Sequence, residues 1–117
     1  MPDFDGAGAK EGMEVWRVEN KVPVPVPTKM YGHFYEGDSY ICLKTTRKGS
    51  GLAWDIFFWL GKDSTQDEQG VAAYKTVELD EMLTYFKYVG EALSDEELIK
   101  AMEPIKAVYV DSRRLHL

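Results

Sequence analysis

Hydrophobic and polar residues alternate along residues 14–20, which is the pattern of a half-buried β-strand. A second strand is expected to follow the turn residues Gly37 and Asp38, with Tyr40 and Cys42 on one side and Ile41 and Leu43 on the other. Residues 52–61 form the most apolar segment, and they are apolar at successive positions. A strand of this kind is typical of the centre of a sheet that is covered on both faces.

Two segments carry the signals of helices. Ser64 or Thr65 can cap a helix with an acidic first turn, and this helix is expected over residues 65–83. A capping-box pattern beginning at Ser94 predicts a second, shorter helix that ends at Pro104.

The remaining segments complete an α+β prediction. Short strands are expected at residues 85–90 and 105–110, whereas the alternating prolines of residues 22–27 favour a stiff surface segment over a central strand. The expected fold is a central five-stranded mixed sheet between one long and one short helix. Residues 1–12 are rich in Asp, Gly and Ala and predict a flexible tail, which leaves residues 13–117 as a single domain.

The expected long helix carries two apolar stripes. One of them can pack on the sheet, and it contains Ala72, Thr76, Leu79 and Leu83. The other lies on a nearly opposite face and contains Ala73, Tyr74 and Val77. This second stripe has no evident partner in so short a chain, so it indicates either an interface or scattered surface residues, and the pattern favours neither.

Composition excludes several classes of function. The 117 residues carry a net charge of −6 and no strong basic patch, which argues against nucleic acid binding. The single cysteine, Cys42, allows neither an intrachain disulfide nor a thiolate metal cluster, and it favours a reducing compartment. No apolar run reaches the length of a membrane span, and the N-terminus does not have the pattern of a signal peptide.

The chain is not expected to be an enzyme. His33 and His116 lie far apart and neither has a recognisable nucleophile or metal-ligand companion. Cys42 lies in the middle of a predicted strand, where a buried and inert thiol is expected. The acidic residues around Asp67 are explained by helix capping.

Several long segments resemble the first domain of the gelsolin, villin and severin family: residues 15–20, 24–27, 31–45, 54–68 and 72–80. The family fold is a central sheet flanked by one long and one short helix. The resemblance implies an actin-binding module under calcium control. One domain offers one actin-binding face, so monomer sequestration or barbed-end capping is expected, and severing only if the chain is part of a longer protein.

The resemblance also implies calcium ligands. Gly37, Asp38 and Glu68 would hold one ion, completed by a carbonyl at or beside Ser112. Carbonyl and carboxylate oxygens are the ligands that calcium prefers. A second ion, shared with actin, would use Asp80, although the loop after this residue is shorter here than in the family.

The long helix is the family's actin-binding element. By resemblance, Ala73, Tyr74 and Val77 would fill a cleft of actin, with Glu78 and Glu81 at the rim. The alternative is a calcium-stabilised scaffold domain with weak or no actin binding, because Tyr74 and Lys21 stand where the family often has other residue types. The expected protein is monomeric by itself and belongs to the cytoplasmic cytoskeleton.

Overall fold

The computed structural model describes residues 2–83, 86–88, 92–103 and 109–113. In chain order, the strands and helices are β1 (Gly12–Glu19), β2 (Val22–Pro25), β3 (His33–Tyr35), β4 (Ser39–Lys48), β5 (Gly51–Leu60), α1 (Gln66–Met82), β6 (Phe86–Tyr88), α2 (Asp95–Ala101) and β7 (Tyr109–Asp111), with short 3₁₀ turns at Pro2–Phe4 and Thr28–Met30. None of the helices described is long and apolar enough to cross a lipid bilayer.

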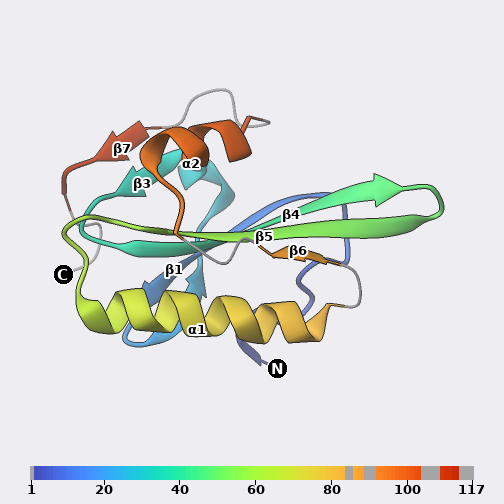
Figure 1. The fold of residues 1–117 in the computed structure, drawn as a ribbon, viewed down its shortest axis with the longest axis horizontal. Helices are drawn as coiled ribbons and strands as arrows, with labels where there is room; N and C mark the ends of the chain where they lie inside the picture. The colour runs from blue at the N-terminus through green and yellow to red at the C-terminus, as the bar shows by residue number, and fades with distance from the viewer. Residues whose placement is uncertain (1, 84–85, 89–91, 104–108, 114–117) are drawn as a thin grey trace.

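The main sheet has five strands in the order β2-β1-β4-β5-β6. Neighbouring strands in this sheet are antiparallel, except for β5 and β6, which are parallel. Helix α1 runs along one face of this sheet, and the shorter α2 lies over the other (Figure 1). The expected α+β fold, a five-stranded mixed sheet between one long and one short helix, is therefore confirmed.

Two of the strands differ from the prediction in the sheet to which they belong. The last strand, expected at residues 105–110, begins at Tyr109 among the described residues and pairs in parallel with β3 as a separate two-stranded sheet. Its expected first part lies outside the residues that the structure describes. The fifth place in the main sheet is taken by the proline-containing β2. Prolines are tolerated there because β2 is an edge strand.

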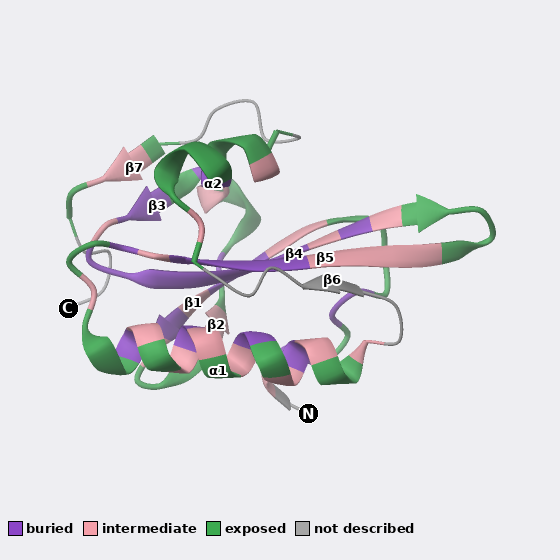
Figure 2. Cartoon of the chain, viewed as in Figure 1, coloured by how far each residue is buried: buried purple, intermediate pink, exposed green. Residues whose placement is uncertain are grey.

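The sheet separates two hydrophobic cores, and β4 and β5 contribute alternate residues to each. Ile41, Leu43, Ile56 and Phe58 face α1, whereas Tyr40, Cys42, Phe57 and Trp59 face α2. The predicted sides of β4 are thus confirmed, and Cys42 is fully buried. Figure 2 shows buried residues running along both central strands.

Both helices begin with the predicted caps. In α1, Thr65 is the N-cap: its hydroxyl accepts from the Glu68 amide at 3.1 Å, and the Glu68 carboxylate accepts from the Thr65 amide at 3.2 Å. Ser94 and Glu97 form the same reciprocal pair in α2. Ser64, the other candidate, instead donates to the Gly61 carbonyl at 2.6 Å. This bond fixes the turn that leads from β5 into α1.

The start of the chain differs from the flexible tail expected for residues 1–12. Phe4 is only 1% exposed and its ring packs edge-to-face against Trp16, with 5.1 Å between centroids. The indole nitrogen of Trp54 donates to the Gly8 carbonyl at 2.8 Å. The small residues suggested mobility, but one aromatic anchor and one backbone contact hold this segment on the core. The domain boundary at residue 13 stays a prediction.

Candidate functional site: the outer face of α1 and a carboxylate corner

Helix α1 has one buried and one exposed side, as its two stripes predict. Ala72, Thr76 and Leu79 are fully buried against the sheet, and the Thr76 hydroxyl donates to the Ala72 carbonyl at 2.7 Å. On the other side Tyr74 is 62% and Val77 41% exposed. The helix already packs on the sheet through its buried stripe, so the exposed apolar side chains are not needed for that packing. They form a surface that a partner can cover.

The other residues predicted for this face take different positions. Ala73 is partly buried and packs against the core on the α1 side, so it borders the exposed surface without forming its centre. Glu78 lies at the flank, where its side chain is only 18% exposed, and Glu81 is exposed. Met82, which the sequence analysis omitted, is 38% exposed at the last helical position. Residues four positions apart lie on the same side of a helix, so the spacing between Glu78 and Met82 is the sequence signal that could have placed Met82 on this face.

An ionic network that the sequence analysis did not predict lies beside Tyr74. The Lys75 ammonium contacts Asp3 and Glu78, each at 2.8 Å. These two carboxylates raise the pKa of Lys75. A hydrogen bond with Glu78 also raises the pKa of the Tyr74 hydroxyl. The charges on this flank are therefore engaged with one another before any partner binds.

The ligands predicted for the first calcium ion lie at the N-terminal end of α1, where separate segments of the chain meet. The Glu36 amide donates to the Asp111 carbonyl at 2.6 Å, and the Gly37 amide donates to the Arg113 carbonyl at 3.1 Å. On the other side of the same turn, the Gly61 amide donates to the Asp38 carbonyl at 2.9 Å. The turn at Gly37 is thus fastened both to the segment around Ser112 and to the loop that leads into α1.

Two carboxylates are buried at this corner. Asp38 is fully buried and Glu68 is 7% exposed. The hydroxyls of Ser39 and Ser64 are 2.9 Å apart, which holds the start of β4 against the turn before α1. The structure therefore brings Gly37, Asp38, the first turn of α1 with Glu68, and the segment around Ser112 to one corner.

The donors at this corner fit a hard cation. Carboxylate and backbone carbonyl oxygens are calcium ligands. Within the described part of the chain, no group of at least three His, Cys, Asp or Glu side chains is placed to hold a metal ion. A calcium ion here would therefore take several ligands from backbone carbonyls or water. Asp80 lies twelve residues after Glu68 on α1, roughly 18 Å along the axis, and so is not part of this corner.

Gly61 shapes the corner in a way that the sequence analysis missed. A β-carbon at this position would overlap the backbone carbonyls of Glu36 and Asp38. Only glycine allows the loop before α1 to approach the turn at Asp38 so closely. A glycine directly after a buried strand indicates in the sequence that another part of the backbone can approach there. The sequence does not identify that part as the turn at Asp38.

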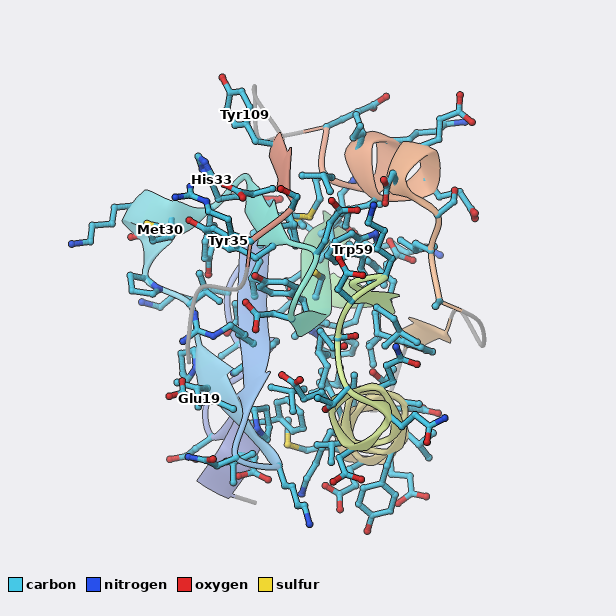
Figure 3. All side chains as sticks on the ribbon, turned by 90° about the vertical axis from the view of Figure 1, so that its left-hand side faces the viewer. Glu19, Met30, His33, Tyr35, Trp59 and Tyr109 are labelled. Atoms are coloured by element: carbon cyan, nitrogen blue, oxygen red, sulfur yellow. The ribbon has the colours of Figure 1, made fainter. Side chains whose placement is uncertain are left out.

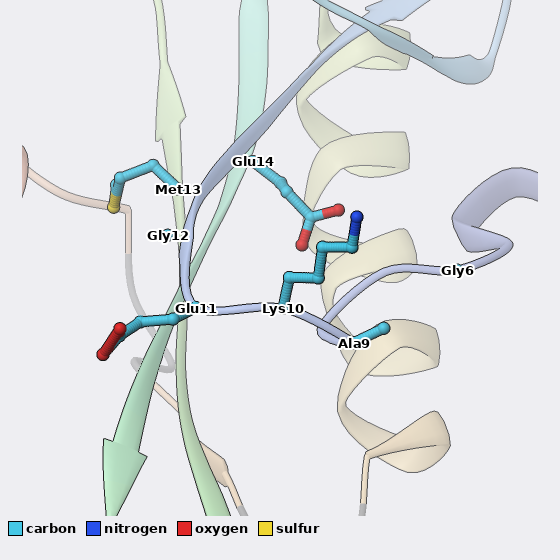
Figure 4. Close-up of a pocket in the computed structure, with 7 residues that line it drawn as sticks. All are labelled: Gly6, Ala9, Lys10, Glu11, Gly12, Met13 and Glu14. Atoms are coloured by element: carbon cyan, nitrogen blue, oxygen red, sulfur yellow. The ribbon is translucent and has the colours of Figure 1, made fainter.

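Two other surface features do not belong to these sites. His33 stacks on Tyr35 and lies beside Tyr109, with ring centroids 5.9 and 5.2 Å apart (Figure 3). A hollow of about 260 Å³ is lined by Gly6 and residues 9–14 (Figure 4). The carboxylate of Glu14 in this hollow accepts a hydrogen bond from the Gly8 amide at 2.9 Å, so it serves to hold the chain start.

The fold and the exposed helix face define a small two-core α+β module with a surface suited to a protein partner. Residues 20–97, more than half of the chain, match the model of the gelsolin repeat. The chain belongs to the gelsolin repeat family. The family assignment confirms the resemblance drawn from the sequence, and it agrees with the expectation that this module is not an enzyme.

Similar curated proteins include a cytoplasmic gelsolin of Homarus americanus, 55% identical over 83 residues, covering 71% of this chain and 11% of that protein. The actin depolymerising venom protein gelsolin 1 of Platymeris rhadamanthus is 58% identical over 86 residues, covering 70% of this chain and 22% of that protein. Villin-5 of Oryza sativa subsp. japonica is 59% identical over 83 residues, covering 70% and 9%. The chain thus spans between about a tenth and a fifth of these relatives.

A solved structure shares the fold. The Thorarchaeota 2DGel3 chain, crystallised with rabbit actin, superposes with a TM-score of 0.59 at 21% identity. The match covers 88% of this chain and 47% of that one.

Proposed function

We propose that this chain binds actin through the outer face of α1. The observation that carries the proposal is the exposure of Tyr74 and Val77 on a helix whose opposite stripe is fully buried. Aromatic and aliphatic anchors at the centre of an interface usually supply most of its binding energy. The name of the venom relative, an actin depolymerising protein, supports the same partner.

The proposed mode of action on actin follows from the presence of one proposed binding face, the outer face of α1. One outer helix face suits sequestration of a monomer or capping of a barbed end, whereas severing also needs a contact elsewhere on the filament. Severing would therefore belong to a longer chain that contains this module. We propose the cytoplasmic cytoskeleton as the place of action, which the single buried Cys42 suits because a reducing compartment leaves it unpaired.

We also propose that calcium binds at the carboxylate corner. Asp38 and Glu68 would supply carboxylate oxygens, and Gly37 and the segment at Ser112 would supply carbonyls. The bound ion would hold the segments of this corner together by its charge. The second ion, with Asp80 as a ligand, stays a prediction. Burial and the neighbouring Glu81 raise the pKa of Asp80, so this carboxyl lies in an environment that disfavours its charge.

The actin proposal predicts that Tyr74→Asp and Val77→Asp weaken binding to actin monomers by about tenfold or more. Both changes put a charge into a contact that must lose its water. The melting temperature should stay nearly unchanged, because both side chains are exposed. Binding is measured by titration of labelled monomers, and its consequence by the assembly of pyrene-labelled actin.

The matched control is Ile99→Asp, which changes an equally apolar residue that is 49% exposed on α2, over the other face of the sheet. It should bind actin like the wild type. If the wild type neither binds monomers nor alters assembly at roughly tens of micromolar, an affinity weaker than about −6 kcal/mol, the actin proposal is wrong. The scaffold reading, with weak or no actin binding, would then be preferred.

A further inference from the structure

The start of the chain is fastened to the rest of the molecule at three positions. Asp3 pairs with Lys75 of α1, and Phe4 is buried against Trp16 of β1. Gly8 donates to the Glu14 carboxylate at 2.9 Å and accepts from the Trp54 indole at 2.8 Å. Residues 3–8, here named the N-terminal brace, therefore link the sheet to α1.

The brace meets α1 next to its exposed face. The Lys75 and Asp3 side chains are 18% and 21% exposed, so their contact of 2.8 Å is partly shielded from water. Lys75 reaches Glu78 at the same distance, and its ammonium lies 5.6 Å from the centre of the Tyr74 ring. Asp3 is thus connected to the Tyr74 ring through the Lys75 ammonium.

This connection restricts the side chain that the proposed interface depends on most. A lysine held by two carboxylates keeps its ammonium in one place, and a tyrosine beside it loses some of its freedom before a partner arrives. Ordering an exposed side chain during binding costs free energy, so a side chain that is already ordered binds more tightly. Without Asp3, Lys75 would keep one of its two carboxylate partners.

We propose that Asp3 is a positioning residue for the outer face of α1. It holds Lys75, and through the Lys75 ammonium beside the ring it fixes Tyr74 in the orientation that a protein partner meets. The inference rests on the proposed function only for its effect on binding. Its effect on Tyr74 is a property of the free protein.

The test compares Asp3→Asn with Asp5→Asn. Asp5 is an exposed residue of the same brace and carries the same charge, so it is a matched control for net charge. In the free protein, the ring signals of Tyr74 in NMR spectra, assigned with Tyr74→Phe, should shift and broaden in Asp3→Asn but not in Asp5→Asn. Asp3→Glu should restore the wild-type signals, because it keeps the carboxylate.

The second measurement is affinity for actin monomers. Asp3→Asn should weaken binding by about two- to fivefold, the effect expected for one partly exposed ion pair. Asp5→Asn should leave the affinity unchanged. In a Lys75→Gln background, Asp3→Asn should add no further loss, because the proposed route passes through Lys75.

Several results would overturn the inference. These are unchanged Tyr74 signals in Asp3→Asn, equal effects of Asp3→Asn and Asp5→Asn, or equal affinities of Asp3→Asn and the wild type. If the wild type does not bind actin at all, the proposed function fails. The Tyr74 signals still decide whether Asp3 positions that ring.

Discussion

At the scale of single residues, Gly61 places the tightest steric demand on the carboxylate corner. We expect Gly61→Ala to lower the free energy of unfolding by about 1–3 kcal/mol, because the added carbon would displace the carbonyls of Glu36 and Asp38. Urea unfolding measures the loss. Because Asp38 belongs to the displaced turn, the same variant should also disturb the proposed calcium site.

Gly70 gives the matched control for this substitution. It lies in the interior of α1, and a β-carbon there would meet nothing within 4 Å. Gly70→Ala should therefore raise stability by about 0.5–1 kcal/mol, the difference in helix propensity. Equal stability of Gly61→Ala and the wild type would show that the turn at Asp38 can move aside at little cost.

The environment of a residue could be predicted from the sequence where it depends only on neighbouring positions along the chain. The burial of Cys42 followed from its place in an alternating strand. The role of Gly61 could not be derived in this way, because the atoms that crowd it belong to residues 36 and 38. Asp3 was missed for the same reason, since its partner Lys75 lies 72 positions further along the sequence.

At the scale of elements, α1 has one side that packs in the core and another side that is exposed and proposed to bind a partner. Leu79→Ala should lower the free energy of unfolding by about 2–5 kcal/mol, because Leu79 is fully buried in the core beneath α1. Val77→Ala, two positions away on the outer face, should change it by about 0.5 kcal/mol or less. Urea unfolding of both variants is the measurement. A similar loss for both would mean that Val77 packs inside the molecule and is not available to a partner.

The helices were easier to predict than the strand pairing. The caps at Thr65 and Ser94 and the two stripes of α1 follow from spacings within one segment. Alternation identifies a strand but does not name its neighbour. For this reason the pairing of β7 with β3, and the entry of β2 into the main sheet, became visible only in the folded chain.

At the scale of the whole molecule, the proposed calcium ion would join parts of the chain that are far apart in sequence. Millimolar calcium should raise the melting temperature, since a ligand that binds only the folded state stabilises it by about 2.7 kcal/mol at a hundred times its dissociation constant. Asp38→Asn and Glu68→Gln should each abolish this shift. Thermal unfolding with calcium and with a chelator is the measurement.

Asp67→Asn is the control for the calcium experiment. Asp67 is exposed in the same first turn of α1 and carries the same charge as Glu68. Its substitution should leave the calcium-dependent shift intact. A wild-type melting temperature that calcium does not change would show that the corner is not a calcium site, and it would leave the actin proposal for the outer face of α1 unaffected.

Edge strand β2 has a further consequence for how the molecule behaves in a crowded solution. The Val26 amide donates to the Val15 carbonyl of β1 at 2.9 Å. Successive backbone nitrogens along an extended chain point to opposite sides, so the nitrogens of Pro25 and Pro23 point away from β1, to the open edge of the sheet. Neither proline has a hydrogen to offer there. An approaching foreign strand would lack two donors at this edge, so growth of the sheet by aggregation is disfavoured on that side.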